Sequence, residues 1–270
     1  MKLFKAVRNN IDKKLHQIRK QNELGLNWFR QKYLKLHRSP DVKTYRLFGK
    51  PLSYISEYDL LHSLKELFIE EVYKADLGSN PLIIDCGANI GLSTLYLKRR
   101  HADARIIAFE PDRLNFKLLN TNVQAFGLNG VEVRQQAVWK EAAILSFKGG
   151  GTLASTIAAA GGDDTYEVSA VKLSDFILEP VALLKIDIEG AEYEVLKEVE
   201  PKLSLVSRIF LEYHSTFEDE YKLLELLDMV HRHGFRFYLK EGLNVYETPF
   251  EQKPTIHPYD IQLNIFCFRP

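Results

Sequence analysis

The sequence has few of the features that would place it outside the cell or across a membrane. Only two of its 270 residues are cysteines, Cys86 and Cys267, and each stands in an apolar run. Two such thiols predict buried side chains rather than a disulfide framework or a metal-binding set. No stretch approaches the roughly 18 consecutive apolar residues of a membrane-spanning helix, and the basic N-terminus lacks the apolar run of a secretory signal. We therefore expect a cytoplasmic protein.

The formal net charge at pH 7 is zero, but the charged residues are unevenly distributed along the sequence. Residues 1–50 contain 14 Lys and Arg against 3 Asp and Glu, or +11, so the other 220 residues hold 22 against 33, or −11. A basic extension joined to an acidic body calls for a separate interpretation of each part. We predict a helical N-terminal extension over residues 1–80 and a second domain over residues 81–270.

The start of the extension has the pattern of an amphipathic helix from Lys2 to Lys20. Its apolar residues recur every three or four positions, and Lys and Arg fill the opposite face: Phe4, Val7, Ile11, Leu15 and Ile18. Apolar and basic residues continue from Leu24 to Leu36, and residues 57–76 predict another helix. A basic amphipathic segment fits peripheral contact with an anionic membrane. Packing against the acidic body, or against a second subunit in a homodimer, stays open as the alternative.

From Pro81 onward, short apolar runs alternate with helical segments. This alternation predicts right-handed crossovers and a mostly parallel sheet, which is an α/β fold. The last two strands leave no room for a helix between them, so we expect the final strand to be antiparallel. The predicted strands are Leu82–Cys86, Arg105–Phe109, Val131–Val138, Val181–Ile188, Ser207–Tyr213, Phe235–Leu239 and Ile261–Phe268, and the helices are Ser93–Arg100, Arg113–Phe126, Ala191–Val199 and Glu218–His233.

A glycine- and alanine-rich insertion, Gly149–Gly162, interrupts this alternation. It offers little to bury and predicts a mobile loop, which is either a lid that closes over a substrate or an inert linker. The flanking segments Ile144–Phe147 and Tyr166–Val171 predict a hairpin.

The ends of the first three strands have the residues of a nucleotide site. In parallel sheets, ligands bind beyond the carboxyl ends of the strands. The first strand leads into the loop from Asp85 to Gly91, which has G-x-x-x-G instead of the G-x-G-x-x-G that receives a pyrophosphate. An acid at Asp85 suits an amino-bearing ligand better. Glu110, at the second strand end, can accept hydrogen bonds from both hydroxyls of a ribose, and Ala137, at the third, leaves space for an adenine.

The fourth and fifth strands end in acids and a histidine. Side chains alternate along a strand, so we expect Asp187 and Glu189 to point the same way from Val181–Ile188. The next strand ends in Glu212-Tyr213-His214, which places His214 beside them. Two acids and a histidine at one sheet edge predict proton transfer or ion binding.

Over residues 81–269, the sequence resembles the FkbM family of methyltransferases. The matching runs are Ile84–Gly91, Ala108–Pro111, Asn120 and Asn122, and Leu184–Glu192 with its Ile-Asp-Ile-Glu-Gly-Ala-Glu sequence. The resemblance implies a Rossmann-like seven-stranded sheet, S-adenosylmethionine as cofactor, and O-methylation of a sugar, a glycan or a sugar-bearing natural product. The implied cofactor-binding residues are Asp85, Gly87, Asn89, Gly91, Ser93, Glu110, Pro111, Ala137 and Asp187.

Methyl transfer to an alcohol requires loss of the hydroxyl proton, for which a base is useful. We predict that His214 is this base and that Asp187 and Glu189 orient it or hold the acceptor hydroxyl. The alternative is that Asp187, Glu189 and His214 bind Mg²⁺, which would lower the pKa of the alcohol. The acceptor is expected to be a small molecule or glycan and not a nucleic acid. Two rival hypotheses are a nicotinamide-dependent oxidoreductase and a non-catalytic nucleotide-binding protein.

Overall fold

The structure is a computed structural model that describes residues 14–37, 39, 41–148, 156–157, 165–251 and 257–270. Its main element is a seven-stranded sheet in the order β12 (Arg236–Glu241), β13 (Ile261–Phe268), β11 (Arg208–Ser215), β10 (Leu183–Ile186), β3 (Leu82–Cys86), β4 (Arg105–Phe109) and β5 (Val131–Arg134). The five strands from β5 to β11 are parallel, and β13 runs antiparallel to both β11 and β12. The predicted Rossmann-like α/β sheet and its antiparallel last strand are confirmed.

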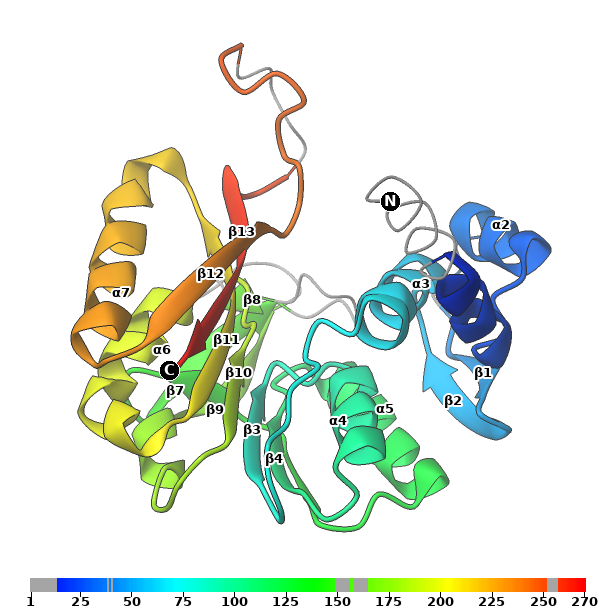
Figure 1. Cartoon of the computed structure of the whole chain (residues 1–270), viewed down its shortest axis with the longest axis horizontal. Helices are drawn as coiled ribbons and strands as arrows, with labels where there is room; N and C mark the ends of the chain where they lie inside the picture. Colours follow the sequence, from blue (N-terminus) through cyan, green and yellow to red (C-terminus); the bar gives the residue numbers. More distant parts are fainter. Residues whose placement is uncertain (1–13, 38, 40, 149–155, 158–164, 252–256) are drawn as a thin grey trace, which may run out of the picture.

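Two pairs of helices cover opposite faces of this sheet, as Figure 1 shows: α4 (Leu92–Arg100) with α5 (Arg113–Phe126), and α6 (Glu192–Val199) with α7 (Glu220–Arg232). Alternation along the strands explains the division, because neighbours such as Ile83 and Ile84 belong to different apolar clusters. Local signals fix the ends of α5. The carboxylate of Asp112 accepts hydrogen bonds from two backbone N–H groups of the first turn, and Gly127 adopts a left-handed conformation after the last.

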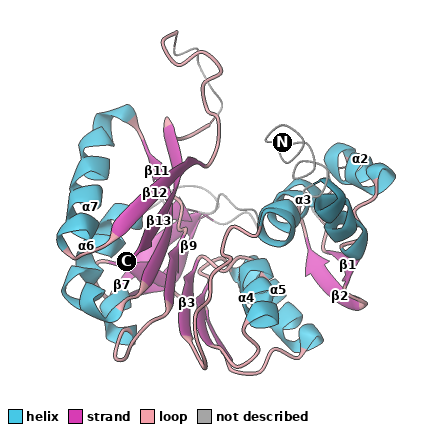
Figure 2. Ribbon diagram, in the orientation of Figure 1, coloured by secondary structure: helices cyan, strands magenta, loops and turns pink. Residues whose placement is uncertain are grey.

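A second sheet of four short strands lies beside the main one, in the order β6 (Ala137–Trp139), β9 (Thr165–Lys172), β7 (Ala143–Lys148) and β8 (Thr156–Ile157) (Figure 2). The predicted hairpin is confirmed as the antiparallel pair β7 and β9. The single predicted strand Val131–Val138 is wrong: the chain leaves the main sheet after Arg134, and β6 pairs with β9 instead. Of the predicted lid Gly149–Gly162, only residues 156–157 lie within the described part of the chain.

The N-terminal segment contributes helices and a hairpin that packs on α5. Residues 14–23 are helical, and they are followed by α2 (Trp28–Leu36), the strands β1 (Lys43–Leu47) and β2 (Lys50–Tyr54), α3 (Glu57–Ser63) and the π-helix η1 (Leu64–Glu70). The hairpin was not predicted. The predicted helix over 57–76 is wrong beyond Glu70, because Glu71 adopts a left-handed φ of 55° that ends it. Tyr73 then packs its ring on Phe210 of β11, with ring centroids 4.8 Å apart.

Along the N-terminal amphipathic segment, the apolar side chains change from exposed to buried at Leu24. Residues 2–13 of the predicted helix lie outside the described residues, and Leu15 and Ile18 are 59% and 53% exposed. Leu24 and Leu26, by contrast, are buried in the same apolar cluster as Ile83. Among the described helices, none is long and apolar enough to cross a membrane.

The loop after β3 approaches the end of β10 so closely that only glycine fits at Gly87. Gly87 has a left-handed φ of +79°, and a Cβ built on it would overlap the backbone carbonyl oxygen of Asp187. Gly49, in the turn between β1 and β2, has nearly the same φ of +80°, but it has no heavy atom within 4 Å of such a Cβ. The two glycines share the backbone conformation and differ only in the space around them.

We predict that Gly87→Ala destabilises the protein more than Gly49→Ala does. The left-handed conformation costs about 1–2 kcal/mol with any Cβ, and forcing a backbone carbonyl aside adds roughly 1–3 kcal/mol at Gly87 alone. Urea unfolding followed by circular dichroism measures both losses. Equal losses in the two variants would show that the loop is not tightly packed on Asp187.

Candidate active site

A cavity that is partly open to solvent lies at the carboxyl ends of β3, β4 and β10. Seven of the predicted site residues line it: Gly87, Asn89, Glu110, Pro111, Ala137, Asp187 and Glu189. Sequence reasoning missed Asn115, Gln136 and Phe147, which also line it. Gln136 precedes Ala137 directly, whereas Phe147 is brought here by the β7–β9 hairpin and carries no local signal.

Glu110 links the segments that follow β3 and β4 at the cavity. Its carboxylate accepts hydrogen bonds from the backbone N–H of Asn89 at 2.7 Å and of Asp112 at 2.9 Å. Burial raises its pKa to about 7, although these two N–H groups act in the opposite direction. Each carboxylate oxygen has two lone pairs, so Glu110 can still accept hydrogen bonds from a ligand in the cavity.

Three predicted cofactor residues lie behind the loop and do not line this cavity. Asp85 is fully buried, and its Oδ2 accepts hydrogen bonds from the hydroxyls of Ser93 at 2.6 Å and Thr94 at 2.8 Å. Gly91 packs against Leu119 of α5. Ser93 reaches a second cavity, between the loop and α3. The three residues hold the start of α4 in place, and their contact with a cofactor stays a prediction.

Lys185 joins β3 to β10 under the cavity. Its side chain is 2% exposed, and its Nζ donates hydrogen bonds to the carbonyl oxygens of Cys86 at 3.2 Å and Gly87 at 2.6 Å. The same ammonium lies 3.4 Å from Asp85 and 3.2 Å from Asp187. Burial alone would lower its pKa, but these two carboxylates raise it above the ordinary value, so Lys185 carries its charge.

Glu192 organises the turn after β10. Its fully buried carboxylate accepts hydrogen bonds from the backbone N–H of Ile188 and of Gly190, each at 3.1 Å, and it lies 3.2 Å from Nδ1 of His214. Glu189 and Gly190 have φ values of 57° and 99°, so the chain turns back sharply here. The Ile-Asp-Ile-Glu-Gly-Ala-Glu run is therefore a tight turn closed by its own last acid, and sequence reasoning assigned Glu192 no role.

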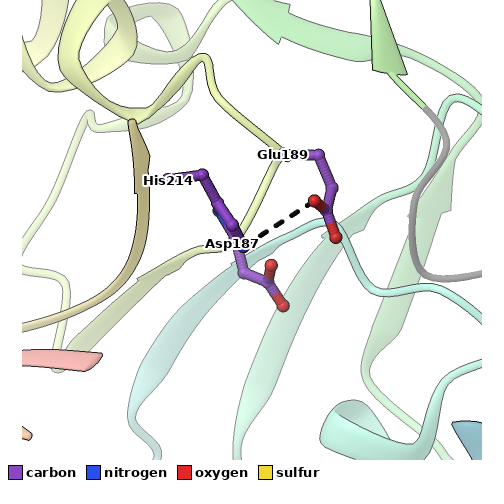
Figure 3. A group of neighbouring side chains, drawn as sticks. All are labelled: Asp187, Glu189 and His214. Atoms are coloured by element: carbon purple, nitrogen blue, oxygen red, sulfur yellow. Dashed lines mark ion pairs between the residues drawn. The ribbon is translucent and has the colours of Figure 1, made fainter. Parts of the chain in front are cut away.

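Asp187, Glu189 and His214 come together as predicted, but for a different reason. β10 ends at Ile186, so Asp187 and Glu189 lie in the turn and do not alternate on a strand. Each of the three offers a nitrogen or oxygen atom within 4.8 Å of the others. Figure 3 shows Glu189 and His214 directed toward one another, and Glu189 Oε2 lies 3.7 Å from His214 Nε2.

Carboxylates dominate the charge around this group. Burial raises the pKa of Glu189 to about 8 and the pKa values of Glu212 and Glu66 to about 7, and the charge of Asp187 adds to each shift. Burial would lower the pKa of His214, but the hydrogen bond and charge of Glu192 and the charge of Glu189 raise it to about 10. The imidazole is thus charged at neutral pH.

Glu212 and Glu66 are further members of this cluster. Strand alternation in the sequence already placed Glu212 on the same face as His214, without a role for it, and Glu66 was missed. Glu66 comes from η1 in the N-terminal segment, and nothing local in the sequence links it to residues near 190.

Comparison with known proteins gives a consistent result. The methyltransferase FkbM domain family matches residues 85–237, more than half of the chain. "Methyltransferase sdnD" of Sordaria araneosa is 34% identical in an alignment 202 residues long that covers 60% of this chain and 78% of that protein. "31-O-demethyl-FK506 methyltransferase FkbM" of Streptomyces tacrolimicus is 27% identical over 72% of this chain and 89% of its own length.

One solved structure of low identity matches most of this chain. The crystal structure of a methyltransferase FkbM from Methylobacillus flagellatus KT is 15% identical, with a TM-score of 0.48. That comparison covers 89% of this chain but only 58% of the solved chain, so this chain spans less than two thirds of it. The family match over residues 85–237 includes the loop after β3, Glu110, the turn after β10 and His214. The chain belongs to the FkbM family of methyltransferases.

Proposed function

We propose that this methyltransferase binds S-adenosylmethionine in the cavity and methylates a hydroxyl group of a sugar, a glycan or a sugar-bearing natural product. The observation that supports this most directly is a cavity lined by three carboxylates, Glu110 after β4 and Asp187 and Glu189 after β10. S-adenosylmethionine has a ribose, and its sulfonium and ammonium together exceed its one carboxylate by a positive charge. Glu110 would accept the ribose hydroxyls, Ala137 and Val138 would contact the adenine, and the carboxylates near β10 would face the cationic end.

Bound S-adenosylmethionine supplies an electrophilic methyl group on sulfur, and the protein has to align the acceptor oxygen and remove its proton. We propose that Glu189 takes this proton rather than His214. A charged imidazole has no lone pair to accept a proton, whereas Glu189 lies in the cavity and can accept one in its ionised form, which the positive charge of bound S-adenosylmethionine would favour. His214, held by Glu192, would then orient Glu189 and balance its charge. A divalent ion at this group would first have to displace the imidazole proton.

The cofactor proposal predicts a loss of affinity in Glu110→Ala. Removing charge-assisted hydrogen bonds to the ribose should weaken binding of S-adenosylhomocysteine by about 1.5–3 kcal/mol, measured by isothermal titration calorimetry. Glu132→Ala is a matched control, since Glu132 lies on the neighbouring strand β5 and its side chain is 54% exposed. NADH should not bind to either variant or to the wild type. Unchanged affinity in a folded Glu110→Ala protein would remove Glu110 from the cofactor site.

The role of His214 can be measured without an acceptor. With ¹⁵N-labelled histidine, NMR of the S-adenosylhomocysteine complex should show that the ring of His214 keeps both protons at neutral pH. Glu189→Gln removes a negative charge that raises the pKa of His214, so the ring should lose its proton at lower pH in this variant. His214→Asn identifies the signal. A ring that titrates near the ordinary pKa of 6.5 would restore His214 as the base, and a spectral change on addition of Mg²⁺ would favour a metal site.

We also propose that the basic extension contacts an anionic lipid surface. The described residues include apolar side chains that are exposed instead of packed, among them Trp28 at 64% and Phe29 at 76% on α2. The Nζ of Lys32 lies 5.2 Å from the centre of the Trp28 ring. An aromatic face edged by Lys and Arg is typical of an interfacial helix.

This membrane proposal predicts that the protein sediments with anionic vesicles and not with neutral ones, and that salt weakens the binding. The double variant Trp28→Ser/Phe29→Ser should lose most of the binding. The matched control is Leu178→Ser/Leu224→Ser, which removes apolar side chains that are 77% and 69% exposed elsewhere on the molecule. A wild-type protein that ignores anionic vesicles at low salt would overturn the proposal.

A further inference from the structure

The acceptor site can be sought on the sheet face that adjoins Asp187. Along β11, Leu211 and Tyr213 pack in the apolar cluster of α6 and α7, so Phe210, Glu212 and His214 point to the opposite face. On the neighbouring β13, Phe266, Asn264 and Gln262 stand directly opposite these three residues. Beside the catalytic group, the sheet therefore presents two rows of side chains that change from aromatic to polar toward the ends of the parallel strands.

The polar part of this face lies on the side of the sheet opposite to α6 and α7 (Figure 1). The N-terminal segment contacts it through η1, where Asn264 Nδ2 donates a long hydrogen bond of 3.4 Å to Glu66. Gln262 Nε2 donates to Glu212 at 2.6 Å. The hydrogen-bonding groups of the face thus come from three elements that are remote in sequence, and they meet next to Asp187.

One buried polar atom on this face has no partner in the protein. Asn264 is 4% exposed, and its Oδ1 is buried without a hydrogen bond. Leaving a buried carbonyl oxygen unpaired costs free energy, and such an atom in a native protein calls for an explanation. A ligand hydroxyl that donates to Oδ1 would satisfy it, and Glu212, opposite Asn264, would accept from a neighbouring hydroxyl.

Most of the accessible charge of the face is negative. Asp187, Glu189 and Glu212 expose 22%, 18% and 17% of their side chains, whereas Lys185 and His214 each expose only 2%. Lys240 of β12 stands directly opposite Asn264 and exposes 47% of its side chain, but its Nζ is paired with Glu70 at 3.0 Å. Lys185 already serves two carbonyl oxygens and two carboxylates. A phosphate, sulfate or carboxylate on the acceptor would meet carboxylates and find no free cation in this cluster.

We propose that the acceptor lies on this face of β11 and β13, with hydroxyl groups against Asn264, Glu212 and Gln262, and that the site selects an uncharged, hydroxyl-rich acceptor over an anionic one. This inference rests on the proposed methyltransferase function and adds the acceptor's place and charge class. Carboxylates and amides together accept from and donate to hydroxyls, which both donate and accept.

The test uses the full-length enzyme and S-adenosylmethionine carrying a tritiated methyl group. It is incubated with immobilised glycans in three sets: neutral, anionic (phosphorylated, sulfated or uronic) and amine-bearing. We expect label on members of the neutral set. Label confined to the anionic or the amine-bearing set would overturn the charge class, and no label on any set, from an enzyme that binds S-adenosylhomocysteine, would overturn the inference. An enzyme that does not bind S-adenosylhomocysteine would instead overturn the proposed function itself.

Variants then locate the acceptor on the neutral glycan that is labelled. Asn264→Ala should raise the KM for that glycan roughly 5- to 100-fold, the effect of losing a hydrogen bond in a buried site, while the affinity for S-adenosylhomocysteine stays unchanged. Gln262→Ala, at a more exposed position, should raise KM in the same direction and guards against misfolding of the first variant. Asn129→Ala is the control, because Asn129 lies in an exposed turn between α5 and β5. Unchanged KM in both Asn264→Ala and Gln262→Ala would place the acceptor elsewhere.

Discussion

The ion pairs and hydrogen bonds of the buried Lys185 ammonium are the interactions on which the geometry of the candidate site depends. The ammonium is the cation between Asp85 and Asp187, and it also binds the carbonyl oxygens of Cys86 and Gly87 where the loop leaves β3. Burying a charge costs several kcal/mol unless it is paired and hydrogen-bonded. The two carboxylates and two carbonyl oxygens offset the free energy that burying the ammonium costs. They also join the end of β3, the loop after it and the end of β10 in one arrangement. Asp85, which a sequence argument would place on a ligand, is occupied in holding that arrangement.

The same edge carries more negative than positive charge, which bears on what it can bind. Glu66, Glu189 and Glu212 keep raised pKa values because each is buried near other carboxylates. A cationic ligand favours their ionised forms, and an anionic one would drive them toward protonation. The excess of acid therefore suits a sulfonium on one side and an uncharged acceptor on the other. Glu192 is the exception in its surroundings, because three donors surround it and its role is to shape the turn and hold His214.

The convergence of Glu110, Asp187 and His214 could be predicted from sequence because parallel strands end at one edge, whatever the details of each strand. The details themselves were less predictable. The sequence Val131–Val138 has the composition of one strand, but its two halves belong to different sheets. The division follows from the pairing of Ala137–Trp139 with β9. The β1–β2 hairpin did have a local signal, with Tyr45 and Leu47 alternately buried around the Phe48-Gly49 turn. Glu66 had none, since its contact with Asn264 joins residues 198 apart.

The N-terminal segment makes hydrogen bonds with residues of the seven-stranded domain on two sides of the candidate site. Asn122 of α5 accepts a hydrogen bond from the N–H of Ser53 in β2, and its side-chain amide donates to the carbonyls of Ser53 and of Ile90 in the loop after β3. Glu66 meets the opposite side of the site at β13. Residues before position 80 are thus linked through Asn122 to the loop after β3, and through Glu66 they contact the face proposed for the acceptor. An enzyme positions its reacting groups through the residues that support them. The geometry of the candidate site therefore depends on the N-terminal segment as well as on the sheet. Within the described part of this segment, Leu15 and Ile18 before Leu24, and Trp28 and Phe29 on α2, keep exposed apolar surface for contacts outside the molecule.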